Sequence, residues 1–269
     1  MTGATATERA RDFFKNYEQE NCTVKRGFVK TENFKRLSEA QKLVEKRGAR
    51  EASLVLIQGH YGIGKSELTE RWAADSGWVF VRAKSTWTKR ALLDELAELM
   101  GLSKVGRNQE VQARIIGKLA VEMVPMIIDE ADFLVGSTAS LLEVIRDITD
   151  LTGTMCFLVG MEHFPMKVER HPHIKSRVNK VVELLPLSLE DVKTTVAAKA
   201  EVQIADEVLP EMLRQAEGRM RLLLNAIANI EAWADANGWD KVTWEHIKGR
   251  PLCPEFTGKP LGRNRGGKQ

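Results

Sequence analysis

A glycine-rich segment that ends in lysine and serine carries the most specific chemistry in this sequence. It reads Gly59-His-Tyr-Gly-Ile-Gly-Lys65-Ser66 and fits the phosphate-binding pattern G-x-x-x-x-G-K-[ST]. Glycines let backbone N–H groups turn inward around phosphates, and the helix that follows adds its positive end. We therefore expect Lys65 to contact the β- and γ-phosphates of ATP and Ser66 to bind Mg²⁺. The residues expected to hold the nucleotide are Gly59, His60, Tyr61, Gly62, Ile63, Gly64, Lys65, Ser66 and Glu67.

Two adjacent acids end an apolar run further along the chain, in Met126-Ile-Ile-Asp129-Glu130. At the end of a strand, one carboxylate can reach the metal ion while the second polarises a water molecule. Asp129 is therefore the predicted metal-side acid and Glu130 the predicted base. The pair favours nucleotide hydrolysis over phosphoryl transfer to a small molecule. The alternative role of Glu130 is that of an acid at a helix N-terminus.

Two arginines downstream are candidates to complete such a site. Arg177 precedes the apolar segment 180–184, a place from which an arginine could reach the γ-phosphate of a neighbouring subunit. Its alternative role is a solvated surface charge. Arg221, near the start of a long helical stretch, could fold back onto the nucleotide, and Arg219 competes for that role. Arg177 and Arg221 are thus candidate catalytic residues, and a trans-acting Arg177 implies an oligomer.

From about residue 53, short apolar runs alternate with amphipathic stretches, which is the pattern of a parallel sheet covered by helices. The predicted strands are 53–58, 78–82, 123–129, 154–160 and, more weakly, 180–184. The predicted helices are 66–76, 89–100, 109–121 and 139–151. The expected fold class is an α/β core with a doubly wound parallel sheet.

The strand pattern stops after Pro186, and a small helical domain is expected to follow. The predicted helices there are 189–201, 205–217, 220–236 and 243–247, and the tryptophans at 233, 239 and 244 are spaced to pack a small core. The predicted organisation is an N-terminal extension (1–29), a nucleotide-binding core (30–186), a helical lid (187–249) and a flexible basic tail (250–269).

The composition is that of a globular protein. The 269 residues are 43% hydrophobic and 29% charged, which excludes disordered and fibrous classes. Three widely spaced cysteines, Cys22, Cys156 and Cys253, argue against a disulfide framework or a zinc site. No apolar stretch approaches the roughly 20 residues that span a bilayer, and the N-terminus lacks the apolar region of a secretory signal. We expect a cytoplasmic protein without membrane contact.

Together these motifs resemble those of an AAA+ ATPase over about residues 30–249. The resemblance rests on the glycine-rich loop, Asp129-Glu130, Ser176-Arg177 and the Gly218-x-x-Arg221 that opens a lid helix. The lead-in 28–34, the strand end 159–162 and the run that follows Arg221 further resemble the MuB, TniB and TnsC group of transposition regulators. That resemblance implies an ATPase that polymerises on double-stranded DNA with ATP, marks target DNA, stimulates a transposase and disassembles on hydrolysis.

The sequence departs from the family pattern in two places. A polar sensor residue normally ends the fourth strand of AAA+ proteins, and here either Glu162 or His163 could take that role. The Mu-type member has a separate N-terminal helix-turn-helix domain, and we do not expect that domain in this chain.

The net charge of +3 is unevenly spread along the chain. Residues 250–269 hold five Lys and Arg against one Glu, and residues 23–50 hold nine against three. Basic ends around a near-neutral centre permit nucleic-acid contact. In the related family, the part of the chain after the second strand faces the central channel, which implies DNA contacts by Lys84, Lys89, Arg90, Lys104 and Arg107. For each of these residues the alternative is an ordinary solvated helix surface.

Two other functions compete with transposition regulation. One is a helicase loader or initiator ATPase of the same superfamily, which would act on single-stranded DNA or on a helicase. The other is a nucleotide-switched interaction protein that does not bind DNA and whose basic residues serve solubility. A metabolic P-loop kinase fits less well, because no acceptor site is recognisable.

Overall fold

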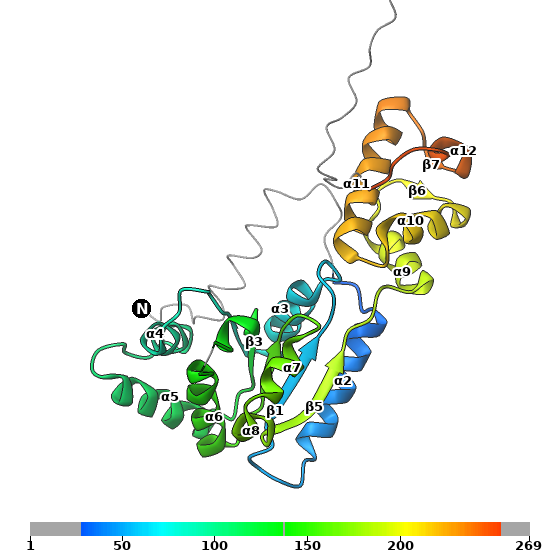
Figure 1. The fold of residues 1–269 in the computed structure, drawn as a ribbon. Coiled ribbons are helices and arrows are strands. Elements are labelled where there is room, and N and C mark those ends of the chain that lie inside the picture. The colour runs from blue at the N-terminus through cyan, green and yellow to red at the C-terminus, as the bar shows by residue number, and fades with distance from the viewer. Residues whose placement is uncertain (1–27, 137, 254–269) are drawn as a thin grey trace, which may run out of the picture.

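The structure is a computed structural model, and it describes residues 28–136 and 138–253. Its centre is a parallel sheet of five strands with the order β2-β3-β4-β1-β5. The strands are β1 (Leu54–Gln58), β2 (Val79–Arg82), β3 (Met126–Asp129), β4 (Cys156–Val159) and β5 (Val178–Glu183). Every predicted strand of the core is present, and the doubly wound α/β fold is confirmed (Figure 1).

Helices cover both faces of this sheet, and β1 shows why the strands are apolar throughout. Leu54 and Leu56 point into one apolar layer while Val55 and Ile57 point into the other, as the two-residue period of a strand requires. The first layer includes α4 (Lys89–Leu99), α5 (Asn108–Glu122), α6 (Ser140–Thr152), α7 (Phe164–Glu169) and α8 (Pro172–Lys175). The second includes α2 (Glu32–Glu45) and α3 (Lys65–Ser76).

Local signals in the sequence set the helix boundaries. Thr88 caps the start of α4 by accepting the Ala91 N–H at 3.2 Å. Gly77 and Gly153 end α3 and α6 in the left-handed backbone conformation, with φ of 71° and 73°. Because these turns are short, β2 and β4 re-enter the sheet directly after the helices that precede them.

Helix α2 is absent from the sequence-based assignment although its signal is present. Leu37, Ala40 and Val44 are buried on one face, at spacings that a helix brings together. They pack in the same apolar layer as Val55 and Ile57, and α2 also contacts β5. The short helices α7 and α8 were also missed; each contains a proline in its first turn, where proline is tolerated.

The chain after Pro186 folds into a helical lid with its own core. Its helices are α9 (Leu189–Lys199), the 3₁₀ helix η2 (Asp206–Val208), α10 (Leu209–Ala216), α11 (Met220–Asn237) and α12 (Trp244–Ile247). The tryptophans 233, 239 and 244 pack against this core. Leu252 is fully buried in it, so the lid continues past residue 249. The rest of the predicted tail, and the N-terminal extension up to residue 27, lie outside the described residues.

The lid also contains two short strands that the sequence analysis did not expect. β6 (Gln203–Ile204) and β7 (Lys241–Val242) pair in parallel. At two residues each they are too short to produce a period, so the expectation that strands end at Pro186 was wrong.

Within residues 28–136 and 138–253, none of the helices combines the length and apolar character that crossing a bilayer requires.

Candidate nucleotide site

The glycine-rich loop leaves β1 and enters the first turn of α3, so the nine residues predicted to hold the nucleotide are contiguous in space as well as in sequence. Gly62 and Gly64 have φ of 79° and 88°, which favours glycine. A side chain at Gly64 would also come within 3.3 Å of Met220 in the lid. The loop can therefore turn its backbone N–H groups toward an anion at the N-terminus of α3.

Lys65 folds back over this loop. Its Nζ donates to the carbonyl oxygens of Gly59 and His60, both at 2.8 Å, and lies 3.6 Å from Met161 Sδ. Burial lowers the pKa of Lys65, and nearby carboxylates, led by that of Glu130, oppose this effect. The ammonium thus lies among acids that come from several elements, and a phosphate would replace the two carbonyl oxygens.

Asp129 ends β3 as a buried carboxylate, 2% exposed, and Arg82 supplies its counter-charge. Arg82 Nε donates to Asp129 Oδ2 at 3.0 Å, and its Nη2 lies 3.8 Å from Glu70 Oε2. Ser66 precedes Glu70 by one helical turn, so both lie on one face of α3. A serine hydroxyl and a carboxylate are oxygen ligands of the kind that Mg²⁺ prefers, so the residues present fit this ion.

Glu130 follows Asp129 in the left-handed conformation, with φ of 54°. Such a backbone is strained for a glutamate, and strain of this kind clusters at functional sites. The 3₁₀ helix η1 (Ala131–Leu134) comes next. Within it, Asp132 accepts the Met161 N–H at 2.7 Å and the Lys167 ammonium at 2.6 Å. Asp132 therefore joins the segment after β3 to the segment after β4.

The two candidate sensor residues differ in their surroundings. Glu162 Oε2 lies 2.7 Å from His60 Nε2 in the glycine-rich loop, whereas the His163 side chain is exposed and its Nε2 lies 3.5 Å from Glu162 Oε1. Of the two, Glu162 is the one that contacts the loop.

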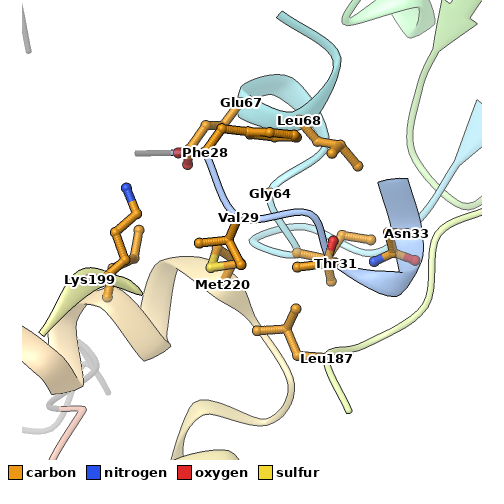
Figure 2. A pocket seen from close by; sticks show the side chains of 12 residues that line it. Phe28, Val29, Thr31, Asn33, Gly64, Glu67, Leu68, Leu187, Lys199 and Met220 are labelled. Carbon is orange, nitrogen blue, oxygen red and sulfur yellow. The ribbon is translucent and has the colours of Figure 1, made fainter. Parts of the chain in front are cut away.

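A narrow pocket of about 40 Å³ adjoins the glycine-rich loop (Figure 2). Its walls come from three places: the lead-in with Phe28 and Val29, the start of α3 with Glu67 and Leu68, and the lid with Met220. Val29 and Met220 both line the pocket and are labelled in Figure 2. A mostly apolar pocket beside a phosphate-binding loop is suited to an aromatic base, and its small volume means that a base must move these side chains apart.

Polar bonds fix the junction between core and lid beside this pocket. Asp191 in α9 accepts the Glu32 N–H at 2.9 Å and also caps its own helix through Ser188. Asn33 exchanges two hydrogen bonds with the backbone of Leu185, at 2.8 and 2.9 Å. The start of α2 therefore holds both the connecting segment and the lid.

The first turn of α11 rests on the glycine-rich loop. The Arg221 N–H donates to the Gly62 carbonyl at 3.1 Å, while the Arg221 side chain is exposed. The Arg219 guanidinium lies 4.5 Å from the Tyr61 ring centre and pairs with Glu217. The structure thus places both candidate lid arginines at the loop, with the side chain of Arg219 packed against it.

Arg177 lies at the N-terminal ends of the parallel strands, whereas the glycine-rich loop lies at their C-terminal ends. Arg177 immediately precedes β5, whose first residue, Val178, pairs in parallel with Leu54 at the start of β1. Its Nε lies 3.0 Å from both carboxylate oxygens of Asp150. Arg177 therefore cannot join the other predicted catalytic residues of its own chain.

The five residues predicted to contact DNA lie before and within the unit formed by α4 and α5. Four of them have acidic partners: Lys84 with Glu95, Lys89 with Glu143, Arg90 with Asp94, and Lys104 with Glu98. Arg90 also donates to the carbonyl oxygens of Lys104 and Gly106 and so holds the loop between the helices. Arg107 is exposed; its backbone N–H donates to Glu110 Oε2 at 3.1 Å, and among the described residues its guanidinium forms no ion pair. DNA contact by these residues stays a prediction.

Arg82, Asp132 and the pocket are features of the site that were not expected from the sequence. Arg82 ends β2 directly beside Asp129 in the sheet, and that pairing exists only in the strand register. Asp132 was recognisable as a third acid two residues after Glu130. Nothing local in residues 28–34 indicates that Phe28, Val29, Thr31 and Asn33 line a pocket with the lid.

A known protein family matches the part of the chain that contains the glycine-rich loop and the acids at the end of β3. Residues 47–167 match the protein family described as AAA domain. No curated protein matches the sequence.

Three solved structures illustrate the likeness of fold. The Aeropyrum pernix ORC2 protein, in ADPNP and ADP complexes, is 16% identical with a TM-score of 0.62, covering 85% of this chain and 69% of that one. The Aeropyrum pernix ORC1 protein in complex with DNA is 20% identical with a TM-score of 0.54, covering 80% and 62%. The Thermotoga maritima RuvB Holliday junction branch migration motor is 19% identical with a TM-score of 0.54, covering 82% and 68%.

The sheet order, the loop between β1 and α3, the acids that end β3 and these likenesses lead to one conclusion about architecture. The chain has the fold of an AAA+ P-loop core carrying a helical lid.

Proposed function

We propose that this protein is a Mg²⁺-dependent ATPase that assembles head to tail on double-stranded DNA and regulates a transposase. The observation that carries the ATPase part is the convergence of Lys65, Asp129 and Glu130 at one edge of the sheet, beside an apolar pocket of the right kind for a base. AAA domain proteins as a class bind and hydrolyse nucleotides, which supports this assignment.

Each residue of the site has a distinct task in this proposal. Backbone N–H groups of the glycine-rich loop bind the phosphates, and Lys65 exchanges its two carbonyl partners for phosphate oxygens. Ser66 and Asp129 would hold Mg²⁺, which supplies charge neutralisation of the phosphates when bound. Glu130 orients and deprotonates the attacking water. Arg219 or Arg221 contacts the bound nucleotide and so links nucleotide binding to the position of the lid.

The self-association part of the proposal rests on Arg177. Since it lies at the far edge of the sheet, the γ-phosphate it could reach belongs to a second copy. Val121 and Leu151, at the C-terminal ends of α5 and α6 on that same edge, are 83% and 64% exposed. Such apolar side chains favour burial by a neighbour. Arg177→Ala should leave the nucleotide affinity of the monomer nearly intact and reduce assembly-dependent turnover by about 1,000-fold; unchanged turnover would remove Arg177 from the site.

The DNA part is tested by binding to labelled double-stranded DNA. Measurements with a slowly hydrolysed ATP analogue, with ADP and without nucleotide, at two salt concentrations, are followed by imaging of the mixtures. We expect salt-sensitive binding with the ATP analogue alone, together with rings or filaments. Absence of binding to any nucleic acid at low salt would instead favour a nucleotide-switched protein that acts on a protein partner.

An initiator-type ATPase is the second candidate function, because two of the three structures named above are ORC proteins and one of these two is in complex with DNA. This candidate predicts a preference for single-stranded DNA or a stable complex with a hexameric helicase. The transposition candidate predicts stimulation of a transposase on double-stranded targets. The same binding experiment with single-stranded competitor separates the two.

A further inference from the structure

His60, in the glycine-rich loop, pairs with Glu162, in the loop after β4. The two loops lie side by side because β1 and β4 are neighbours, with Ile57 opposite Val159 and the Gly160 N–H donating to the Ile57 carbonyl at 2.9 Å. The pair joins His60 Nε2 to Glu162 Oε2 at 2.7 Å. It thus connects two loops that are about 100 residues apart in sequence and that the sheet brings together.

The backbone that carries Glu162 is fixed. The Met161 N–H donates to Asp132 at 2.7 Å, and Asp132 is itself held by Lys167. At Gly160 a Cβ atom would lie only 2.5 Å from the Phe164 ring and 2.8 Å from Asp132 Oδ2, so the chain there passes where no side chain fits. Because the backbone of residues 160–162 is held in this way, the scaffold determines the position of Glu162.

Glu162 places a negative charge near Lys65, the residue predicted to bind the γ-phosphate. Lys65 is the predicted ligand of that phosphate, its Nζ touches Met161 Sδ, and the Glu162 carboxylate is among the charges that act on it. The other predicted contacts to the phosphates are N–H groups or cations. Glu162 is 39% and His60 62% exposed, so solvent screens this charge only in part.

We infer that the Glu162–His60 pair discriminates between ATP and ADP at this site. With ADP or no nucleotide, the pair is closed as seen here. The γ-phosphate of ATP repels Glu162 and takes His60 as a hydrogen-bond donor, which opens the pair and displaces the Glu162 side chain. The inference rests on the proposed ATPase function and assigns Glu162 a specificity-determining role with His60 as its partner.

Two substitutions in one pair should then act in opposite directions. Glu162→Gln removes the repulsion, so the Kd for a non-hydrolysable ATP analogue falls about tenfold while the Kd for ADP stays within about twofold. His60→Ala leaves the carboxylate without its partner, so the Kd for the ATP analogue rises about threefold to tenfold, again with ADP little changed. The double variant should behave like Glu162→Gln. Titration calorimetry measures the affinity of four full-length proteins for each nucleotide: the unmodified chain, the two single variants and the double variant.

Glu169→Gln is the matched control, because Glu169 ends α7 and pairs with Lys175. It should leave both affinities unchanged. If Glu162→Gln and His60→Ala weaken ATP analogue and ADP alike, the pair merely supports the loop and the inference fails. If the unmodified chain binds neither nucleotide, the proposed ATPase function fails instead. Thermal melting without ligand checks that each variant is folded.

Discussion

Two charged regions of the molecule differ in where their ion partners come from. One is the loop edge, by which we mean Lys65 and the acids around it, Asp129, Glu130, Asp132 and Glu162. The other is the unit formed by α4 and α5. At the loop edge, Lys65 lies among acids that arrive from β3, η1 and the loop after β4. In the α4–α5 unit, Arg90 and Lys104 have acidic partners nearby in sequence, Asp94 and Glu98, while Lys89 pairs with Glu143 of α6. Charges that converge from separate elements indicate a site, whereas charges balanced within a helix or its next loop indicate a surface.

The loop edge is the region whose disruption should have the largest effect. Lys65→Ala removes the cation that exchanges carbonyl oxygens for phosphates, so nucleotide affinity should fall by at least about 100-fold and assembly should be lost with it. Fluorescent-nucleotide titration and sedimentation measure the two losses. Retained assembly without nucleotide binding would break the proposed dependence of one on the other.

Glu130→Gln should separate binding from hydrolysis at the same edge. The amide keeps the shape of the side chain and cannot accept a proton, so turnover should fall by about 100-fold or more while ATP still binds. The assembly should then be trapped, because its dissociation requires hydrolysis. Phosphate release and sedimentation in ATP are the measurements. Loss of assembly equal to that of Lys65→Ala would contradict this division of roles.

Arg90→Ala tests whether this residue of the α4–α5 unit is structural. It removes the bonds to Asp94 and to two loop carbonyl oxygens, so the free energy of unfolding should fall by about 1–3 kcal/mol with nucleotide affinity unchanged. Urea denaturation measures this. Lys89→Ala is the control, since Lys89 lies 3.9 Å from Glu143 and should cost less than about 0.5 kcal/mol. Full stability with a large loss of DNA affinity would make Arg90 a DNA ligand and weaken the comparison.

Arg107→Ala should give the smallest effect. If Arg107 contacts a phosphate of DNA, its loss weakens binding about twofold to fivefold and lowers the slope of log affinity against log salt by about one. Lys104→Ala, which removes a charge already paired with Glu98, should change that slope less. Equal slopes for both variants and the unmodified chain would leave the α4–α5 unit without a role in DNA binding.

Most of the core could be predicted because its signals are local. The apolar run that ends at Asp129 is short and rich in β-branched isoleucine, as in Ile127-Ile128, which indicates a strand buried on both faces. The spacing of the glycine-rich loop specifies a phosphate site because the chemistry requires a fixed number of residues between glycine and lysine. The β6 and β7 strands had no such signal, and tertiary packing formed them.

The sequence by itself determined the five-stranded core, the phosphate loop and the two acids of the site, since each depends on a periodicity or spacing within about ten residues. Only the tertiary structure decided which distant side chains meet. The strand order brings Arg82 into contact with Asp129 and His60 into contact with Glu162. Docking of the lid places Met220 against the loop and closes the pocket. These contacts join segments far apart in the chain, and their existence depends on the summed packing of sheet and helices, which no local pattern encodes.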